Sequence, residues 1–231
     1  MLLQQIVYDM MGWGITIDIG VPLYISIWTL LLALFLFYEA KRYIYQQLKP
    51  LRTAVFFSEK GMIIGAIVGS VLMILSIAAH EAGHAVAASA FNFPITGAGV
   101  TGWGAYVSLP DGYAKGTPWA MIIVSFAGPI TNILLALVCY VIVRLMDESL
   151  AENTIQFVAH MNYRLGVFNF APFIVLDGGK FVLGVMRLFF SEDLAFTITM
   201  TISGVMLGWF LFFRKSEKDS RNFIERELEK A

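Results

Sequence analysis

Residues 61–84 read GMIIGAIVGSVLMILSIAAHEAGH, and this stretch governs how the whole chain is interpreted. Residues 61–79 contain no charged side chain and come close to the roughly 20 residues that a helix needs to cross the hydrocarbon core of a membrane. His80, Glu81 and His84 follow directly. Ionisable side chains are costly at the end of a membrane span, so we expect these three to serve a function.

The composition is that of a membrane protein. Hydrophobic residues form 58% of the 231 residues and charged residues 14%, with a mean hydropathy of +0.72, which lies outside the usual range of soluble domains. Three more uncharged runs reach spanning length, at residues 19–38, 117–143 and 194–213. Residues 154–191 predict two further helices around an irregular segment at 172–179. We therefore expect an all-α polytopic fold with about six transmembrane helices.

Charge and cysteine content exclude several classes of protein and site. The net charge of −1 offers no basic footprint for nucleic acid. Cys139 is the only cysteine in the sequence, which rules out an intrachain disulfide and a cysteine-based zinc site. No cleavable signal peptide is expected, because the N-terminus lacks a basic region and carries Asp9 and Asp18 before the first apolar run. A bound metal is therefore expected on histidine and carboxylate ligands.

The segment His80-Glu81-Ala82-Gly83-His84 is an H-E-x-x-H motif. On a helix the two histidines lie on one face and can bind one metal ion together. Zinc at a hydrolytic site takes three protein ligands and a water, whose pKa falls to about 7. Glu81 is then placed to act as general base. A single histidine could instead be bonded within the helix bundle, but the three side chains together favour one Zn²⁺ per chain.

The third ligand is expected to be Asp177. This residue ends a mostly apolar run at residues 165–176, and Gly178 and Gly179 after it let the backbone turn and approach closely. His160 is the competing choice and would give a three-histidine site. The other acidic candidates lie at predicted loop edges: Asp147, Glu148, Glu152, Glu192 and Asp193.

Residues 97–110 form an unusual connector because they are rich in glycine. Two β-prone pieces joined by glycines predict a small membrane-embedded hairpin, since non-helical backbone at membrane depth has to be buried in protein or line a wet cavity. Residues 13–19 alternate apolar and polar side chains and predict another strand, with a disordered leader as the alternative. The sheet could recruit an extended peptide or act only as a lid.

Three motifs together resemble the site-2 protease family of intramembrane metalloproteases. The first is HEAGH at residues 80–84. The second is NFAPFIVLDG at residues 169–178, which is similar to the family's N-x-x-P-x-x-x-x-D-G pattern. The third is FAGPITN at residues 126–132, which is similar to an A-G-P-x-x-N element. The resemblance covers residues 63–188.

The resemblance implies a three-helix catalytic core that holds zinc below the membrane surface. The expected activity is cleavage of transmembrane segments of other proteins, often as the second cut in regulated intramembrane proteolysis. Asn132 and Asn169 would hold substrate backbone or the oxyanion, although asparagine also bonds at ordinary helix breaks. The loop that contains Gly102, Trp103 and Gly104 would accept substrate as an added strand.

The chain is expected to be one membrane-embedded metalloprotease domain over residues 1–231. Its catalytic core would cover residues 61–190, between an N-terminal strand or leader at residues 1–20 and a polar C-terminal tail at residues 214–231. The tail has the charge pattern of a solvated helix. The short connectors leave no room for a PDZ or CBS domain, so a minimal member of the family is expected.

The resemblance also favours a multi-pass protein of a prokaryotic cell membrane, with the active site and both termini toward the cytosol. Basic residues occur on both sides of the membrane in this arrangement, so the positive-inside rule cannot be satisfied throughout. The expected partners are a transmembrane protein substrate and membrane lipid. Two alternatives stay open: a CAAX-prenyl-type metalloprotease, which would need a later glutamate as third ligand, and a membrane scaffold or metal carrier that shares the fold.

Overall fold

The computed structural model describes residues 14–18, 20–48, 59–102, 104–110 and 116–228, with side chains in the last helix described as far as residue 212. The fold is mostly helical and includes one four-stranded sheet. The elements along the chain are β1 (Gly14–Asp18), β2 (Pro22–Ser26), α2 (Thr29–Leu48), α3 (Glu59–Ala90), β3 (Gly97–Thr101), β4 (Gly104–Ser108), α4 (Pro118–Arg144), α5 (Leu150–Asn169), α6 (Asp177–Met186) and α7 (Glu192–Leu228).

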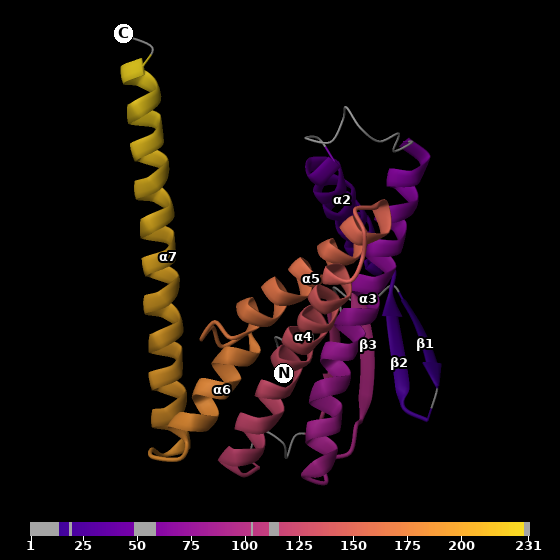
Figure 1. The fold of residues 1–231 in the computed structure, drawn as a ribbon. Helices are drawn as coiled ribbons and strands as arrows, with labels where there is room; N and C mark the ends of the chain where they lie inside the picture. The colour runs from indigo at the N-terminus through magenta and orange to yellow at the C-terminus, as the bar shows by residue number, and fades with distance from the viewer. Residues whose placement is uncertain (1–13, 19, 49–58, 103, 111–115, 229–231) are drawn as a thin grey trace.

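The helices α3, α4 and α5 form the centre of the molecule (Figure 1). Helix α4 packs against α3, α5 and α6, whereas α2 covers α3 and part of α5. The buried apolar cluster between α2, α3 and α5 includes Leu36, Met73, Phe157 and Val158. Helix α7 stands to one side of this bundle and meets it through α6 (Figure 1). The central position of α4 lets its residues reach both α3 and α5.

Three helices are long and apolar enough to cross a membrane within the part of the chain that the structure describes: Glu59–Ala90, Pro118–Arg144 and Glu192–Phe212. They contain three of the four predicted apolar runs, except for one end residue in two of them, and they support a membrane protein. The predicted total of six transmembrane helices is not confirmed by these three.

The prediction of a span at residues 19–38 is wrong. Residues 22–26 form strand β2, and helix α2 begins only at Thr29. Gly20, which has a φ of 95°, and Pro22 interrupt helical geometry at this point. Helix α2 also continues to Leu48 through residues that we predicted as a polar connector at 41–60. A count of uncharged residues cannot detect that this segment pairs with a distant strand.

The sheet has the strand order β1-β2-β3-β4. Strands β1 and β2 form an antiparallel hairpin, β2 and β3 pair in parallel, and β3 and β4 form the predicted second hairpin. The predicted N-terminal strand is present at Gly14–Asp18, while Trp13 and Ile19 lie outside the described residues. The Thr29 hydroxyl donates a hydrogen bond of 3.1 Å to the Val100 carbonyl, which joins the start of α2 to β3.

The break that we predicted at residues 172–179 lies at residues 170–176, between α5 and α6, and residues 177–179 already belong to α6. Helix α7 holds this segment, because the Ser203 hydroxyl donates to the Pro172 carbonyl at 2.8 Å and accepts from the Ile174 N–H at 3.1 Å. A Cβ at Gly178 would overlap the Phe170 carbonyl, so the glycine permits the close turn that the sequence predicted.

The charge pattern that we predicted for the C-terminal tail falls on side chains outside the described residues.

Candidate metal centre

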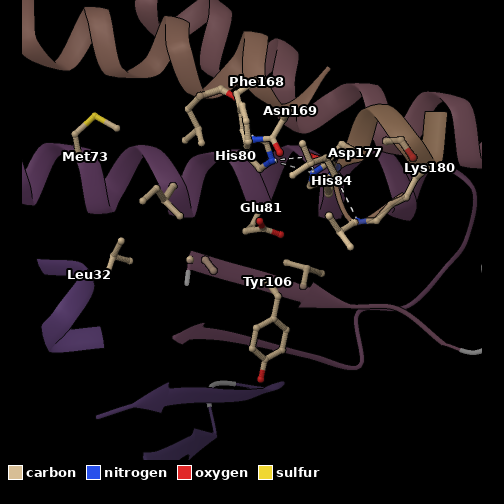
Figure 2. Close-up of a pocket in the computed structure, with 18 of the residues that line it drawn as sticks. Leu32, Met73, His80, Glu81, His84, Tyr106, Phe168, Asn169, Asp177 and Lys180 are labelled. Atoms are coloured by element: carbon tan, nitrogen blue, oxygen red, sulfur yellow. Dashed lines mark hydrogen bonds and ion pairs between the residues drawn. The ribbon is translucent and has the colours of Figure 1, made fainter. Parts of the chain in front are cut away.

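Two helices bring three potential metal ligands together. His80 and His84 lie one turn apart on α3, and Asp177 is the first residue of α6. The Nε2 atoms of the histidines are 3.1 Å apart. Oδ2 of Asp177 lies 3.0 Å from Nε2 of His80 and 3.2 Å from Nε2 of His84 (Figure 2). The structure therefore joins the predicted histidine pair and the predicted aspartate at one point.

The other ring nitrogen of each histidine is bonded to a protein oxygen. Nδ1–H of His84 donates to the Val124 carbonyl at 2.6 Å, and a carbonyl oxygen can only accept. Nδ1–H of His80 donates to Oδ1 of Asn132. Both imidazoles thus carry their proton on Nδ1 and present the lone pair of Nε2 toward Asp177. Such bonds fix the ring orientation of metal-binding histidines.

These three atoms fit a divalent metal. Two nitrogen lone pairs and a carboxylate oxygen within 3.0–3.2 Å of one another repel one another unless a cation lies among them. Ligands about 2.0–2.1 Å from a tetrahedral zinc ion are themselves about 3.3 Å apart, close to the observed spacing. Their buried position also excludes most of the water that would otherwise screen this repulsion.

Glu81 lies beside the histidines. The ligand atoms of His80, Glu81 and His84 all fall within 4.8 Å of one another, so these residues form a group that could hold a metal ion. Figure 2 shows the Glu81 carboxylate pointing away from α3 toward β4. The side chain is half-buried and lines the cavity at the site. A carboxylate there can exchange a proton with a molecule bound in the cavity.

Asp177 is held in place through both of its oxygens. While Oδ2 faces the histidines, Oδ1 accepts a hydrogen bond of 3.2 Å from Nζ of Lys180. Lys180 lies one turn later on α6, and half of its side chain is exposed to solvent. The lysine therefore orients the carboxylate without entering the cluster of ligand atoms.

Residues 68–148 match the model of peptidase family M50, and this stretch contains both histidines, Glu81 and Asn132. We call residues 68–148 the M50 segment, because this stretch resembles peptidase family M50. Asp177 lies outside the M50 segment. This match confirms the predicted resemblance to the site-2 protease family.

Two curated relatives also resemble the chain. "Putative zinc metalloprotease Rip3" of Mycobacterium tuberculosis is 25% identical over 183 residues, which cover 66% of this chain and 46% of that protein. "Putative zinc metalloprotease sll0528" of Synechocystis is 26% identical over 121 residues, which cover 52% and 31%. The chain thus spans less than half the length of these relatives.

The fold is similar to that of a solved structure, Site-2 Protease from Methanocaldococcus jannaschii. The TM-score is 0.57 at 18% sequence identity, and the likeness covers 89% of this chain and 87% of the other. It covers a larger share of the chain than the M50 segment does. The likeness shows a shared fold.

A cavity of about 940 Å³ opens beside the metal centre. Its walls come from α2, α3, α4, α5, α6 and β4, and most of the side chains that line it are apolar, among them Leu32, Met73, Tyr106 and Phe168 (Figure 2). Strand β4 is the last strand of the sheet, so the sheet ends at this cavity. The cavity can therefore accept an apolar chain beside a strand edge.

Of the three loop residues that we predicted to contact substrate, one lines the cavity. Gly104 lines the cavity, whereas Gly102 packs against Trp28, and Trp103 lies outside the described residues. The cavity wall is formed by strand β4 more than by the turn before it. His160, the competing third ligand, stacks against Tyr43 with ring centroids 5.7 Å apart instead of joining the metal centre.

The two predicted asparagines also differ in position. Asn169 lines the cavity, and its Nδ2 donates to the Leu165 carbonyl at 3.1 Å. Asn132 is fully buried behind His80, and its Nδ2 donates to Oδ1 of Asn162 at 2.8 Å. Both polar groups of Asn132 are thus engaged inside the protein. This placement makes Asn132 a partner of His80 in the structure.

Sequence reasoning missed three residues at the site. A Cβ at Gly128 would overlap Nε2 of His84, so this glycine makes room for the two rings. Asn162 bonds Asn132, and Ser125 lines the cavity with a buried hydroxyl. Gly128 carried a signal, because it lies in the FAGPITN motif. Asn162 and Ser125 carried none, since their roles depend on contacts between helices.

Proposed function

We propose that the chain is an intramembrane zinc metalloprotease that hydrolyses peptide bonds within or near transmembrane segments of membrane proteins. The observation that carries the proposal is the convergence of His80 Nε2, His84 Nε2 and Asp177 Oδ2 within 3.0–3.2 Å, beside the carboxylate of Glu81. The first two ligands belong to a helix that is long and apolar enough to cross a membrane. The match of residues 68–148 to peptidase family M50 supports the same chemistry.

Zinc bound by these three ligands would supply a Lewis acid and lower the pKa of a water to about 7. Glu81 is the proposed general base, which takes a proton from the attacking water and later delivers it to the leaving amine. Val124 and Asn132 keep Nδ1 of the histidines protonated, and Lys180 keeps Asp177 oriented. The cavity beside Glu81 holds the scissile peptide bond.

The proposed substrate is a transmembrane segment in extended form. A peptide bond inside an α-helix is shielded by its own turn, so the segment has to unwind before its carbonyl carbon can be attacked. The backbone at the edge of β4 offers pairing to such a strand, and apolar side chains of the cavity suit its side chains. Asn169 is the proposed donor to substrate backbone or to the oxyanion, where one such donor contributes a few kcal/mol.

We further propose a multi-pass topology with about six crossings, a catalytic core at residues 61–190 and the active site toward the cytosol of a prokaryotic cell. Regulated intramembrane proteolysis is the proposed process. A C-terminal reporter fused to the full chain tests the orientation, since both termini are then expected inside. Reporter activity outside the cell would contradict it.

Hydrolysis is tested with the detergent-purified chain reconstituted into liposomes together with a model transmembrane peptide labelled at both ends. Cleavage is expected to stop after removal of metal by a chelator and to return when Zn²⁺ is added. A carrier or scaffold would bind Zn²⁺ without cutting any member of a panel of such peptides. Cleavage that persists after complete removal of metal would contradict the proposal.

A further inference from the structure

The metal centre is connected to a buried polar network that crosses three helices. Nδ1–H of His80 on α3 donates to Oδ1 of Asn132 on α4, and Nδ2 of Asn132 donates to Oδ1 of Asn162 on α5 at 2.8 Å. Nδ2 of Asn162 then donates to Ser76 Oγ at 3.0 Å and to the Val158 carbonyl at 2.9 Å. Asn132 and Asn162 are both completely buried.

The far end of this network fixes its direction. The Val158 carbonyl can only accept a hydrogen bond, so the amino group of Asn162 has to face it. The Ser76 hydroxyl already donates to the Leu72 carbonyl at 2.9 Å, so it too accepts from Asn162. The oxygen of Asn162 must then face Asn132, and this in turn points the amino group of Asn132 toward Asn162.

The orientation of Asn132 determines which nitrogen of His80 carries the proton. With its amino group facing Asn162, Asn132 offers an oxygen to His80, and Nδ1 of His80 therefore keeps its proton. An asparagine amide has nearly the same shape in either orientation, so Asn132 alone does not determine this choice. A flipped Asn132 would present N–H to Nδ1, and the proton of His80 would then lie on Nε2, where it blocks metal binding.

We infer that Asn162 is a positioning residue that fixes the protonated nitrogen of His80, and thereby keeps Nε2 available to the metal. It acts through Asn132, since among the described residues Asn162 bonds Asn132 and has no direct hydrogen bond to His80. The inference rests on the metal site of the proposed function. It goes beyond that function by assigning a role to a side chain on α5.

The first test measures the zinc affinity of the detergent-solubilised chain by competition with a chromophoric chelator. Asn162→Leu keeps the approximate volume of the side chain and removes the network. Outer partners of metal ligands contribute about 10- to 100-fold to metal affinity, and a loss in this range is expected. Asn153→Leu is the matched control, because Asn153 is also a buried asparagine of α5 but lies outside this network, where its Nδ2 donates to the local Ser149 carbonyl at 2.9 Å.

A double-mutant comparison separates orientation of Asn132 from simple helix packing. Asn132→Asp gives a carboxylate that offers an oxygen to His80 whichever way it turns. In that background Asn162→Leu is expected to change zinc affinity by no more than about twofold. An equal loss in both backgrounds would overturn the inference and leave Asn162 as a packing residue.

A second readout needs neither metal nor activity. The chain has three histidines, so ¹⁵N spectra of a metal-free protein with His160→Ala and Asp177→Ala report only His80 and His84. Asp177→Ala removes the carboxylate that would otherwise accept a proton from Nε2 of both rings. His80 is expected to be protonated on Nδ1 in this protein and to shift toward Nε2 after Asn162→Leu, while His84 stays unchanged. An unchanged His80 would overturn the inference. Failure of the unsubstituted chain to bind zinc would instead contradict the proposed function, and the spectra would still test the role of Asn162.

Discussion

Gly128 of α4 lies directly against His84 of α3: a Cβ at Gly128 would overlap Nε2 of the His84 ring. The same atom would stand 2.6 Å from Nε2 of His80, closer than non-bonded heavy atoms approach. The bare backbone of α4 thus forms one wall of the metal centre. The two rings converge because this wall has no side chain.

Gly128→Ala is therefore expected to lower zinc affinity by at least about tenfold, because the new methyl group displaces both imidazoles from their positions. Metal content after purification and affinity by chelator competition measure the effect. Gly204→Ala is the control, since Gly204 lies in helix α7 and a Cβ there would meet no atom within 4 Å. Full zinc occupancy at unchanged affinity in Gly128→Ala would contradict this account of the site.

Asp177→Ala and His160→Ala are expected to differ in metal content. About one zinc per chain is expected in the unsubstituted protein. Asp177→Ala removes an oxygen that lies 3.0 Å from Nε2 of His80, so this variant should lose its zinc. His160→Ala should keep it, because His160 stacks on Tyr43. Elemental analysis of both proteins at matched purity decides the matter, and the opposite pattern would exclude Asp177 as third ligand.

Glu81→Gln is expected to keep zinc and to lose hydrolysis by about 100-fold or more, because the amide cannot accept the proton of the attacking water. Cleavage of the labelled peptide in liposomes and metal content are measured on the same preparation. A peptidase requires this base, whereas a metal carrier does not. Undiminished cleavage in Glu81→Gln would show that another group is the base.

Ser125→Ala is expected to preserve or raise thermal stability. Ser125 Oγ is the one buried side-chain nitrogen or oxygen atom without a hydrogen-bond partner among the described residues, and such an atom costs about 1–3 kcal/mol. Ser70 provides the contrast, because its hydroxyl donates to the Ala66 carbonyl at 2.7 Å. Melting temperatures of both alanine variants in one detergent make the comparison. A clear loss of stability in Ser125→Ala would reveal a partner for its hydroxyl.

The sequence predicted those parts of the site whose signals are local. His80, Glu81 and His84 lie within five consecutive residues, so helical periodicity alone places the histidines on one face. Asp177 could be proposed because a charge followed by two glycines interrupts an apolar run. The break between α5 and α6 and the second hairpin were predicted from proline and glycine in the same way.

The parts that failed depend on contacts between distant segments. The uncharged run at residues 19–38 resembles a membrane span, but its residues 22–26 form strand β2, which pairs with the distant strand β3. Asn132 and Asn162 carry no signal in the sequence, because their hydrogen bond forms only where α4 packs against α5. Hydropathy and motif spacing describe one segment at a time and therefore carry no information on such pairs.

The parallel pairing of β2 with β3 has a consequence for the order of assembly. Leu23 faces Ala98, and all of α2 and α3 lies between them, so the chain has to form a large loop before these strands meet. Contacts so distant in sequence form late, because the entropy of loop closure opposes them. We expect the histidine motif on α3 to be complete before β3 and β4 complete the cavity wall. The two histidine ligands would then be in place before the strand edge that the proposed substrate pairs with.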